Sequence, residues 1–369
     1  ALAYWWGIDI RRALNAFTSV LIITCPCALS LSSPFTLGNV LRILSRNKIF
    51  MKNALAIEKM AGIKAVVFDK TGTLTNNNET RVEFSGGKLS DYELELIKSL
   101  VYHSSHPLSR KIYGNLKSIK AIPTEHFKET EGKGIEGWID ENFVKLGSRR
   151  YVLGSETGPD DGESDFRQAS RVYVAVNGNL KGYFVVRNEY RTGLGALISH
   201  LKHRFKLFVV SGDNDTEKNF LKQYVAEENL VFHQQPADKL QFIKRLQREG
   251  EPVMMVGDGL NDAGALKQAN VGLAISDNVN NFFPACDGII EASKFELIPD
   301  LMAYARRSVN IIKASFGISL LYNLVGLSFA VQGNLSPLIA AVLMPISSVT
   351  IIVFTTLSST LAMPKSMQR

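Results

Sequence analysis

The chain has 369 residues, enough for two or three domains, and 46% of them are hydrophobic. Its net charge is +7, but no basic stripe is interleaved with aromatic residues, which disfavours a nucleic-acid partner. Three cysteines are too few for the disulfide framework of a secreted domain, and Cys25 and Cys27 are one residue apart, which indicates reduced thiols in a special setting.

The first residues are apolar and aromatic, with neither an initiator Met nor the pattern of a signal peptide. Aromatic residues followed by Asp9, Arg11 and Arg12 are typical of the end of a membrane helix. We therefore expect the chain to be the C-terminal part of a longer protein.

Residues 13–38 form an uncharged run of membrane length that is broken by Pro26 and Pro34. Proline removes a backbone hydrogen bond and opens a helix, so Cys25-Pro26-Cys27 would direct two sulfurs toward neighbouring helices. Thiolates are soft ligands that select soft ions such as Cu(I). The alternative is that the two cysteines pack as small apolar side chains, as a lone membrane cysteine usually does. Four basic residues follow and place this end of the run in the cytoplasm: Arg42, Arg46, Lys48 and Lys52.

The middle of the chain changes to a soluble α/β pattern near Ile63. Buried strands are predicted at 65–69, 207–210 and 253–256, each followed by a polar turn, with helices at 194–202 and 240–248. Short alternating runs from about 120 to 185 predict an antiparallel sheet. The fold class is therefore α/β, a doubly wound parallel sheet with an inserted α+β domain, flanked by transmembrane helices.

Two further uncharged spans are predicted at 314–331 and 335–362, separated by a turn at Gly333-Asn334. Arg306, Arg307 and Lys313 precede the first of them, so the soluble middle is expected in the cytoplasm. The predicted domains are a transmembrane segment (1–58), a phosphorylation domain in two parts (59–79 and 187–305), an inserted nucleotide-binding domain (80–186) and two C-terminal transmembrane helices (306–369).

Acidic residues follow three of the predicted strands: Asp69, Asp213, and Asp258 with Asp262. Carboxylates held close together repel one another unless a cation lies among them, and oxygen ligands suit Mg²⁺. Asp69 could then attack the γ-phosphoryl group of a nucleotide, with Lys239 and Ser211 stabilising the phosphate oxygens. The alternative is that these aspartates only cap helices, which is common for one such residue and uncommon for three turns in one chain.

The motifs Asp69-Lys70-Thr71-Gly72-Thr73 and Gly257-Asp258-Gly259-Leu260-Asn261-Asp262 resemble the phosphorylation and hinge motifs of P-type ATPases. The resemblance implies a haloacid-dehalogenase-like phosphorylation domain whose Asp69 is phosphorylated by Mg-ATP. It also implies that Mg²⁺ is held by the Asp69 carboxylate, the Thr71 carbonyl and Asp258, with Asp262 in the catalytic set.

Two motifs of the inserted domain resemble the adenine site of the heavy-metal (CPx-type) group of these ATPases. They are His106-Pro107 and the glycine motif of Gly132, Gly134 and Gly137. Ser105 and Ser148 depart from it, because Glu and Asn are common at these positions. Without the resemblance, the glycines would indicate a hairpin turn and His-Pro a helix terminus.

The last two spans resemble the Cu(I)-transporting class at Tyr322-Asn323 and at Met344 with Ser347-Ser348. A thioether suits a soft monovalent ion, and uncharged ligands lower the cost of a site within lipid. The resemblance therefore implies a copper site of Cys25, Cys27, Tyr322, Asn323, Met344 and Ser347, with Ag(I) as a surrogate ion. Cys286, in the soluble part, is expected only to pack.

The sequence thus predicts ATP-driven export of Cu(I) through an aspartyl-phosphate, by a multi-pass protein of a bacterial inner membrane. The resemblance implies further partners: the lipid bilayer, a copper chaperone or metal-binding domain that delivers Cu(I), and an upstream actuator domain. A Zn²⁺/Cd²⁺ pump is the nearest alternative, disfavoured by the uncharged last spans. A soluble phosphatase of the dehalogenase type would lack the spans and would usually have Asp where this chain has Thr71.

Overall fold

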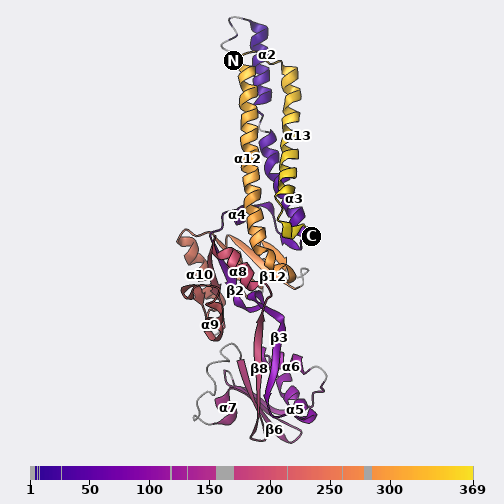
Figure 1. Cartoon of the computed structure of the whole chain (residues 1–369), viewed down its shortest axis with the longest axis vertical. Helices are drawn as coiled ribbons and strands as arrows, with labels where there is room; N and C mark the ends of the chain where they lie inside the picture. The colour runs from indigo at the N-terminus through magenta and orange to yellow at the C-terminus, as the bar shows by residue number, and fades with distance from the viewer. Residues whose placement is uncertain are drawn as a thin grey trace. The chain divides into compact units, whose positions relative to one another are not determined.

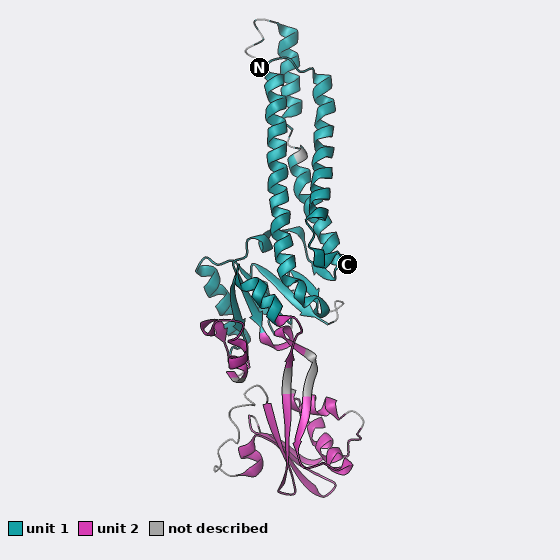
Figure 2. Cartoon of the chain, viewed as in Figure 1, with its two compact units in different colours: residues 1–69, 195–210, 234–369 teal, residues 70–194, 211–233 magenta. Residues whose placement is uncertain are grey.

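The computed structural model describes residues 5, 7, 9–25, 27–116, 119–130, 132–154, 170–213, 215–259, 261–277 and 285–368. Most of the aromatic stretch at the start of the chain, which we expect to end a membrane helix, lies outside these residues. The chain forms two compact units (Figure 2). Unit 1 comprises Ala1–Asp69, Gly195–Val210 and Gln234–Arg369, and unit 2 comprises Lys70–Leu194 and Ser211–His233.

Unit 1 contains a mainly parallel sheet, of which Figure 1 labels β2 and β12, and its strand order is β1-β13-β12-β11-β2-β9. Its central strands are short apolar runs, and every residue of β2, β11 and β12 is buried, as expected for a parallel sheet covered on both faces. Register pairs Val256 with Phe68 and Phe68 with Val209, so strand ends meet at one edge. The strands are β1 (Ile49–Met51), β2 (Ala65–Asp69), β9 (Lys206–Val210), β11 (Val253–Gly257), β12 (Val271–Ser276) and β13 (Gly288–Glu291).

Four helices of unit 1 lie along the chain between these strands: α4 (Ala54–Ala61), α8 (Leu194–Lys202), α10 (Pro236–Arg248) and α11 (Ala263–Gln268). Helix α10 begins with Pro236 in its first turn and buries Phe242, Ile243 and Leu246 along one face. Alternation of strand and helix confirms the predicted parallel α/β sheet, in which β1 is an antiparallel edge strand.

Four longer helices complete unit 1: α2 (Ile10–Ile23), α3 (Cys27–Arg46), α12 (Ile298–Val331) and α13 (Pro337–Leu361). The predicted run at 13–38 is not one helix, because α2 ends at Ile23 and α3 begins at Cys27. The prediction that Pro34 also breaks the run is wrong, since α3 continues through it. Hydroxyl side chains can bind carbonyl groups near such a proline, and Thr36 Oγ1 donates to the Ser32 carbonyl at 2.8 Å.

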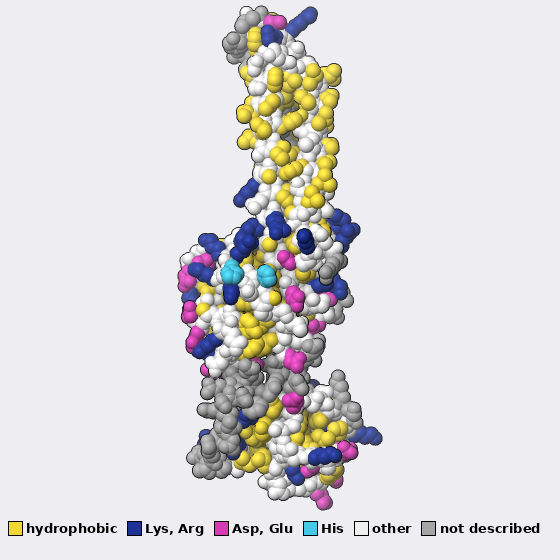
Figure 3. All heavy atoms as spheres, viewed as in Figure 1, with side chains coloured by type: hydrophobic (Ala, Val, Ile, Leu, Met, Phe, Trp, Pro, Cys, Tyr) yellow, Lys and Arg dark blue, Asp and Glu magenta, His cyan; other side chains and the backbone are white. Residues whose placement is uncertain are grey.

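Among the described residues, two helices are long and apolar enough to cross a membrane. They are Ala292–Val331, which includes α12, and Pro337–Leu361, which is α13, with mean hydropathies of 1.6 and 2.3. Most side chains of their apolar windows face outward, and Leu338 and Leu361 are 77% and 82% exposed. Apolar side chains cover this part of unit 1 (Figure 3). A surface of this kind is unfavourable in water and suits a hydrocarbon environment.

Unit 2 contains an antiparallel sheet with the strand order β3-β8-β7-β6-β5-β4, which confirms the predicted inserted α+β domain. The strands are β3 (Thr75–Gly86), β4 (Glu125–Thr130), β5 (Gly134–Ile139), β6 (Asn142–Gly147), β7 (Ser170–Val176) and β8 (Asn179–Tyr190). The remaining elements are α5 (Asp91–Tyr102), α6 (Pro107–Asn115), α7 (Arg149–Leu153), α9 (Lys218–Leu221) and β10 (Leu230–Val231).

The core of unit 2 lies between its sheet and helices α5 and α6. Leu96 and Leu100 from α5 pack with Val174 and Phe184 from the strands. Helix α5 starts at a capping box in which Ser90 and Glu93 satisfy each other's backbone groups. The ends of β4, β5 and β7 and the start of α6 surround a cavity.

Candidate functional site

The strand β2 delivers Asp69 to the carboxyl end of the parallel sheet of unit 1. Asp69 is 3% exposed, and its Oδ1 accepts a hydrogen bond from Lys239 Nζ at 2.6 Å. The same lysine nitrogen lies 2.7 Å from Oδ1 of Asp262, which precedes α11. Lys239 comes from the first turns of α10, so three elements bring one cation and two carboxylates together. The predicted proximity of Asp69, Lys239 and Asp262 is what the structure shows.

The charges in this cluster shift one another's protonation. Burial and the negative charge of Asp262 together raise the pKa of the Asp69 carboxyl to about 7, against the opposing effect of Lys239. Burial also raises the pKa of Asp262. For Lys239, burial acts to lower the pKa, but the two carboxylates outweigh it and the pKa is raised. One lysine therefore does not fully compensate the buried carboxylates.

A cation would fit this negative excess. Asp262 Oδ2 is buried and has no hydrogen-bond partner among the described residues. Asp258 follows β11 in the same turn and adds to the charges that raise the pKa of Asp69. Carboxylate oxygens are the ligands that Mg²⁺ prefers. Still, in the described part of the chain no group of three or more His, Cys, Asp or Glu side chains is placed to hold a metal ion, and Lys239 lies between Asp69 and Asp262.

A second charged cluster, in unit 2, is centred on Lys70. Its Nζ lies 2.8 Å from both Asp213 Oδ2 and Glu217 Oε2, and Thr71 Oγ1 donates to Asp213 Oδ2 at 2.7 Å. Tyr190 donates to Glu217 at 3.0 Å. Burial acts to lower the pKa of Lys70, but Glu217 and Asp213 outweigh it, so the pKa is raised and the lysine stays charged. Asp213 is therefore the partner of Lys70 and Thr71 within unit 2.

The loop that follows Asp69 is fixed by backbone contacts within unit 2. Gly72 has φ +73°, a conformation that glycine adopts without strain, and its N–H donates to Thr75 Oγ1 at 3.1 Å. Arg191 donates through Nε to the Thr73 carbonyl at 2.9 Å and through a terminal nitrogen to the Gly72 carbonyl at 3.0 Å. Ser211 is fully buried, and its Oγ accepts from the Asp213 N–H at 3.1 Å.

Sequence reasoning missed Glu217, Tyr190 and Arg191. Glu217 follows Asp213 by four residues, and the tyrosine and arginine follow the last apolar residues of β8. A search for the partners that a buried Lys70 requires could have pointed to Glu217, because buried lysines are nearly always paired. Nothing in the sequence identifies Arg191, whose role depends on the path of the loop at 72–73.

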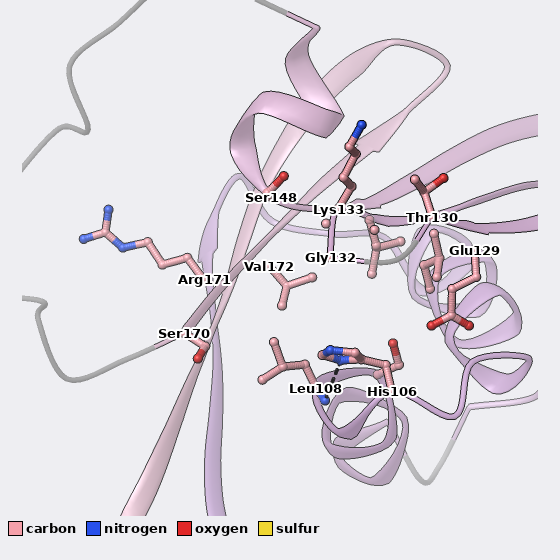
Figure 4. A pocket seen from close by; sticks show the side chains of 15 residues that line it. His106, Leu108, Glu129, Thr130, Gly132, Lys133, Ser148, Ser170, Arg171 and Val172 are labelled. Atoms are coloured by element: carbon pink, nitrogen blue, oxygen red, sulfur yellow. Dashed lines mark hydrogen bonds between the residues drawn. The ribbon is translucent and has the colours of Figure 1, made fainter. Parts of the chain in front are cut away.

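A cavity of about 570 Å³ opens in unit 2 at the predicted nucleotide motifs (Figure 4). His106, Gly132 and Gly134 line it, together with Ser148, which stands where the resembling family has Asn. His106 caps α6, and its Nδ1 accepts the Leu108 N–H at 3.2 Å (Figure 4), which fixes the ring at the cavity wall. Other lining residues include Glu129, Thr130, Lys133 and Arg171.

Two residues of the predicted nucleotide site, Gly137 and Pro107, differ in their placement from the residues that line the cavity. Gly137 does not line the cavity, and an added Cβ there would meet Leu100 Cδ1 at 3.0 Å and Thr124 Cγ2 at 3.1 Å. The prediction that Gly137 contacts nucleotide is therefore corrected: its missing side chain lets β5 pack against α5. Pro107 occupies the first position of α6, as proline often does, and its side chain lies outside the described residues.

The cysteine pair contradicts one prediction. Cys25 and Cys27 are joined in a disulfide, with Cα atoms 5.5 Å apart, and are not reduced thiols. They flank the break between α2 and α3, where the chain leaves helical geometry and brings the two residues within disulfide range. Pro26 itself lies outside the described residues. Because the thiolate is the metal ligand, ion binding by both sulfurs requires this disulfide to be reduced.

The other predicted copper ligands are half-buried residues of α12 and α13. The Tyr322 hydroxyl donates to the carbonyl of Leu343 at 2.9 Å, and Leu343 is the residue that precedes Met344. Ser347 Oγ donates to the Met344 carbonyl at 2.7 Å, and Ser348 Oγ does so at 3.3 Å. Asn323 is half-buried on the same turn as Tyr322. Cys286 is a buried free cysteine, as expected for a packing residue.

The family model of haloacid dehalogenase-like hydrolases matches residues 63–270. The chain therefore belongs to the haloacid dehalogenase-like hydrolases. This match contains Asp69, Lys239, Asp258 and Asp262, the residues of the charged cluster in unit 1 and of the turn beside it.

Curated relatives agree with the resemblance to heavy-metal P-type ATPases. The chain is 31% identical over 351 residues to the nitrogen fixation protein FixI of Rhizobium leguminosarum bv. viciae, covering 94% of this chain and 45% of that protein. It is 30% identical over 352 residues to a copper-exporting P-type ATPase of Staphylococcus saprophyticus, covering 93% and 44%. The chain thus spans about half the length of the curated relatives it matches.

Solved structures support the same fold. A zinc-transporting PIB-type ATPase in its E2.Pi state superposes with a TM-score of 0.75 at 22% identity, covering 97% of this chain and 59% of that one. The catalytic CPx-ATPase domain CopB-B superposes with a TM-score of 0.53 at 26% identity, covering 72% of this chain and 98% of that domain. The haloacid-dehalogenase-like fold predicted from the motifs is confirmed.

Proposed function

We propose that this chain is the catalytic and ion-binding part of an ATP-driven pump that exports Cu(I) from the cytoplasm through an aspartyl-phosphate. The observation that carries the proposal is Asp69, a buried carboxylate at the end of β2 that is bound by Lys239. A carboxylate in this position can act as a nucleophile, and a lysine beside it can take up the charge of a phosphoryl group.

In the proposed reaction an Oδ of Asp69 attacks the γ-phosphorus of ATP. The bond to the β,γ-bridging oxygen breaks, and ADP leaves with that electron pair. Lys239 Nζ then faces a phosphorylated Asp69, while Asp262 keeps the lysine in place. Ser211 is the proposed donor to a phosphate oxygen. Asp69 must be ionised to attack, and with a pKa of about 7 it is so in only part of the population near neutral pH.

Magnesium would be held by the Asp69 carboxylate, the Thr71 carbonyl and Asp258, as the resemblance implies. When bound, it supplies positive charge that neutralises the phosphoryl oxygens. The unpartnered oxygen of Asp262 and the raised pKa of Asp69 fit the need for such a charge.

The cavity at His106 is the proposed site of the adenosine part of ATP. His106, Gly132 and Gly134 line it, and the missing side chain of Gly134 lets β5 and β6 approach closely at its wall. Its volume of about 570 Å³ falls within the range of small-molecule sites. Lys133 and Arg171 on its wall provide positive charge for the phosphates.

The long apolar helices are proposed to lie in a bacterial inner membrane, with the parallel sheet of unit 1 and the whole of unit 2 in the cytoplasm. Cu(I) is proposed to bind to reduced Cys25 and Cys27, supported by Tyr322, Asn323, Met344 and Ser347. No ionisable Asp, Glu, Lys, Arg or His occurs in 314–331 or 335–362, which favours Cu(I) over Zn²⁺ because a divalent ion would need more negative charge. A copper chaperone or metal-binding domain is the proposed donor, and the relatives' additional length leaves room for an actuator domain.

Phosphorylation assays on the complete gene product test this proposal. Its phosphorylation by ATP should be stimulated by Cu(I) and Ag(I), and lost in Asp69→Asn and Cys25→Ser. Acid-stable phosphoprotein that persists in Asp69→Asn would disprove the aspartyl-phosphate. Stimulation by Zn²⁺ alone would show that the transported ion is Zn²⁺ and not Cu(I).

A further inference from the structure

Helices α12 and α3 share a line of buried hydroxyl groups. Ser32 on α3 and Ser315 on α12 contact each other through their Oγ atoms, and both are fully buried. One turn further along α12, Ser319 is 3% exposed. Its Oγ has no hydrogen-bond partner among the described residues.

Ser319 differs in this from the serines around it. Serines in a helix usually donate to a carbonyl three or four residues earlier. On α12, Ser308 donates to Tyr304, Ser315 to Ile312 and Ser328 to Val325, each at 2.7 Å. An unpaired buried hydroxyl costs free energy, which is greater still where no water is present to bind it. A hydrogen-bond acceptor placed next to Ser319 would remove this cost.

Contacts on either side of Ser319 show what it faces. Ser315 touches Ser32 on α3, and an added Cβ at Gly326 would meet Ile23 on α2 at 3.1 Å. The face of α12 between these two points therefore lies opposite the segment between Ile23 and Ser32. That segment contains the break between α2 and α3, and with it Cys25 and Cys27.

The heights along the helices agree. Ser319 lies four residues beyond Ser315, about 6 Å along α12 at 1.5 Å per residue. Cys27 lies five residues before Ser32, about 7.5 Å along α3 by the same rise. Because α12 and α3 run in opposite directions, Ser319 and Cys27 lie at nearly the same level along the helix axes. The hydroxyl of Tyr322, three residues beyond Ser319, donates its hydrogen bond to the Leu343 carbonyl.

We infer that Ser319 belongs to the ion site of the two cysteines, where its hydroxyl donates a hydrogen bond to a thiolate sulfur of Cys25 or Cys27. This rests on the proposed function, in which the reduced cysteines bind the transported ion. A hydroxyl oxygen is a hard donor and a poor ligand for a soft ion, whereas a metal-bound thiolate readily accepts a hydrogen bond. Such outer contacts orient ligands and stabilise their charge. Ser319 is thus a positioning residue that acts through the sulfur.

The test measures Cu(I) affinity of the complete gene product in detergent, after a phosphine has reduced the disulfide to two thiols. Competition with a chromophoric Cu(I) chelator gives the dissociation constant. We expect Ser319→Ala to weaken binding about tenfold, equivalent to about 1.4 kcal/mol. Ser319→Thr, which keeps the hydroxyl, should bind within about twofold of the wild type. Ser328→Ala is the matched control, because Ser328 is an exposed serine of the same helix.

Copper X-ray absorption separates a hydrogen bond to sulfur from direct ligation. Wild type and Ser319→Ala should show the same sulfur neighbours, and loss of an oxygen neighbour in the variant would overturn the assignment. Unchanged affinity in Ser319→Ala would overturn it as well, while Cys25→Ser still abolishing binding would leave the proposed function intact. If wild type binds no Cu(I), the proposed function and this inference fail together.

Discussion

Lys239 donates to Asp69 at 2.6 Å, although the two residues are 170 positions apart in the chain. The contact ties the first turns of α10 to the end of β2 and holds a buried carboxylate that would otherwise lack a cation. The contact does not return the pKa of Asp69 to its usual value, because burial and Asp262 still raise it to about 7. The cluster is therefore sensitive to pH in the range where cells work.

Asp69→Asn should change how stability depends on pH. Since the pKa of Asp69 rises from 3.8 unfolded to about 7 folded, the native state binds the proton more tightly. This contribution to stability is fully present below pH 3.8 and is lost as the pH rises through 7. The amide does not titrate. The free energy of unfolding of the variant, relative to that of the wild type, should therefore increase by roughly 1–3 kcal/mol as the pH rises from 5 to 8.

Thermal unfolding followed by intrinsic fluorescence at several pH values measures this difference. A change of 1 kcal/mol corresponds to about 2–4 °C for a unit of this size. Glu228→Gln, at an exposed carboxylate, is the control and should run parallel to wild type at every pH. A melting-temperature difference between Asp69→Asn and wild type that stays constant from pH 5 to pH 8 would contradict the raised pKa.

Lys70→Met should destabilise unit 2, because it leaves Glu217 buried without its cation. The Glu217 side chain is only 8% exposed, and the loss of one partner of a buried pair typically costs about 3–5 kcal/mol. The double variant Lys70→Met/Glu217→Gln should recover much of this, since it removes the buried charge of Glu217 and the remaining partner, Asp213, has a side chain that is 45% exposed. Urea unfolding monitored by tryptophan fluorescence compares the two. Equal stability of the single and double variants would contradict the expected cost of leaving Glu217 without Lys70.

The parts of the molecule that depend on local patterns were predictable from the sequence. Strand β2 is an uninterrupted apolar run that ends in Asp69, and helix α8 was predicted with its observed bounds. The meeting of Asp69 with Asp262 followed from a general property of parallel sheets, whose carboxyl ends lie at one edge. Lys239 was included because phosphoryl transfer to Asp69 calls for a cation that stabilises the phosphate oxygens.

Features that depend on the path of the chain were not predictable. Pro34 reads as a helix breaker, but neighbouring helices and hydroxyl groups accommodate it within α3. Gly137 belongs to a motif that suggests nucleotide contact, whereas its position in β5 makes it a packing residue. Arg191 is an ordinary arginine in the sequence, and only the loop at 72–73 gives it carbonyl partners.

Arg191→Lys should slow phosphorylation of Asp69 without weakening ATP binding. The planar guanidinium holds two successive carbonyls, those of Gly72 and Thr73, and a lysine cannot reproduce that geometry. The loop would then position Thr71 less well, so we expect a decrease of about tenfold in the rate of phosphoenzyme formation, comparable to one lost hydrogen bond to a charged group. Rapid-quench measurement with labelled ATP gives the rate, and nucleotide binding is measured separately. A matching loss of ATP affinity would place Arg191 in the nucleotide site instead.

Gly134→Ala and Gly132→Asn should separate two ways in which glycines shape the nucleotide cavity. At Gly134 an added Cβ would fall on the Leu146 carbonyl oxygen and within 2.8 Å of Gly147 Cα, across a paired stretch of β5 and β6 that cannot move apart easily. Gly132 has φ +69° and open space at its Cβ position, and Asn tolerates that conformation.

We therefore expect Gly134→Ala to lower ATP affinity by more than about tenfold, the effect of losing roughly 1.4 kcal/mol of binding energy. Gly132→Asn should stay within about threefold of wild type, since its backbone conformation is kept and a single strained residue costs roughly 1 kcal/mol. Isothermal titration with ATP measures both variants, and circular dichroism shows whether the sheet of unit 2 persists. If Gly132→Asn loses affinity as strongly as Gly134→Ala while the sheet is intact, the nucleotide must occupy the space beside Gly132. The cavity wall would then contact ATP there directly, and the shape of the β5–β6 edge would matter less than this close approach.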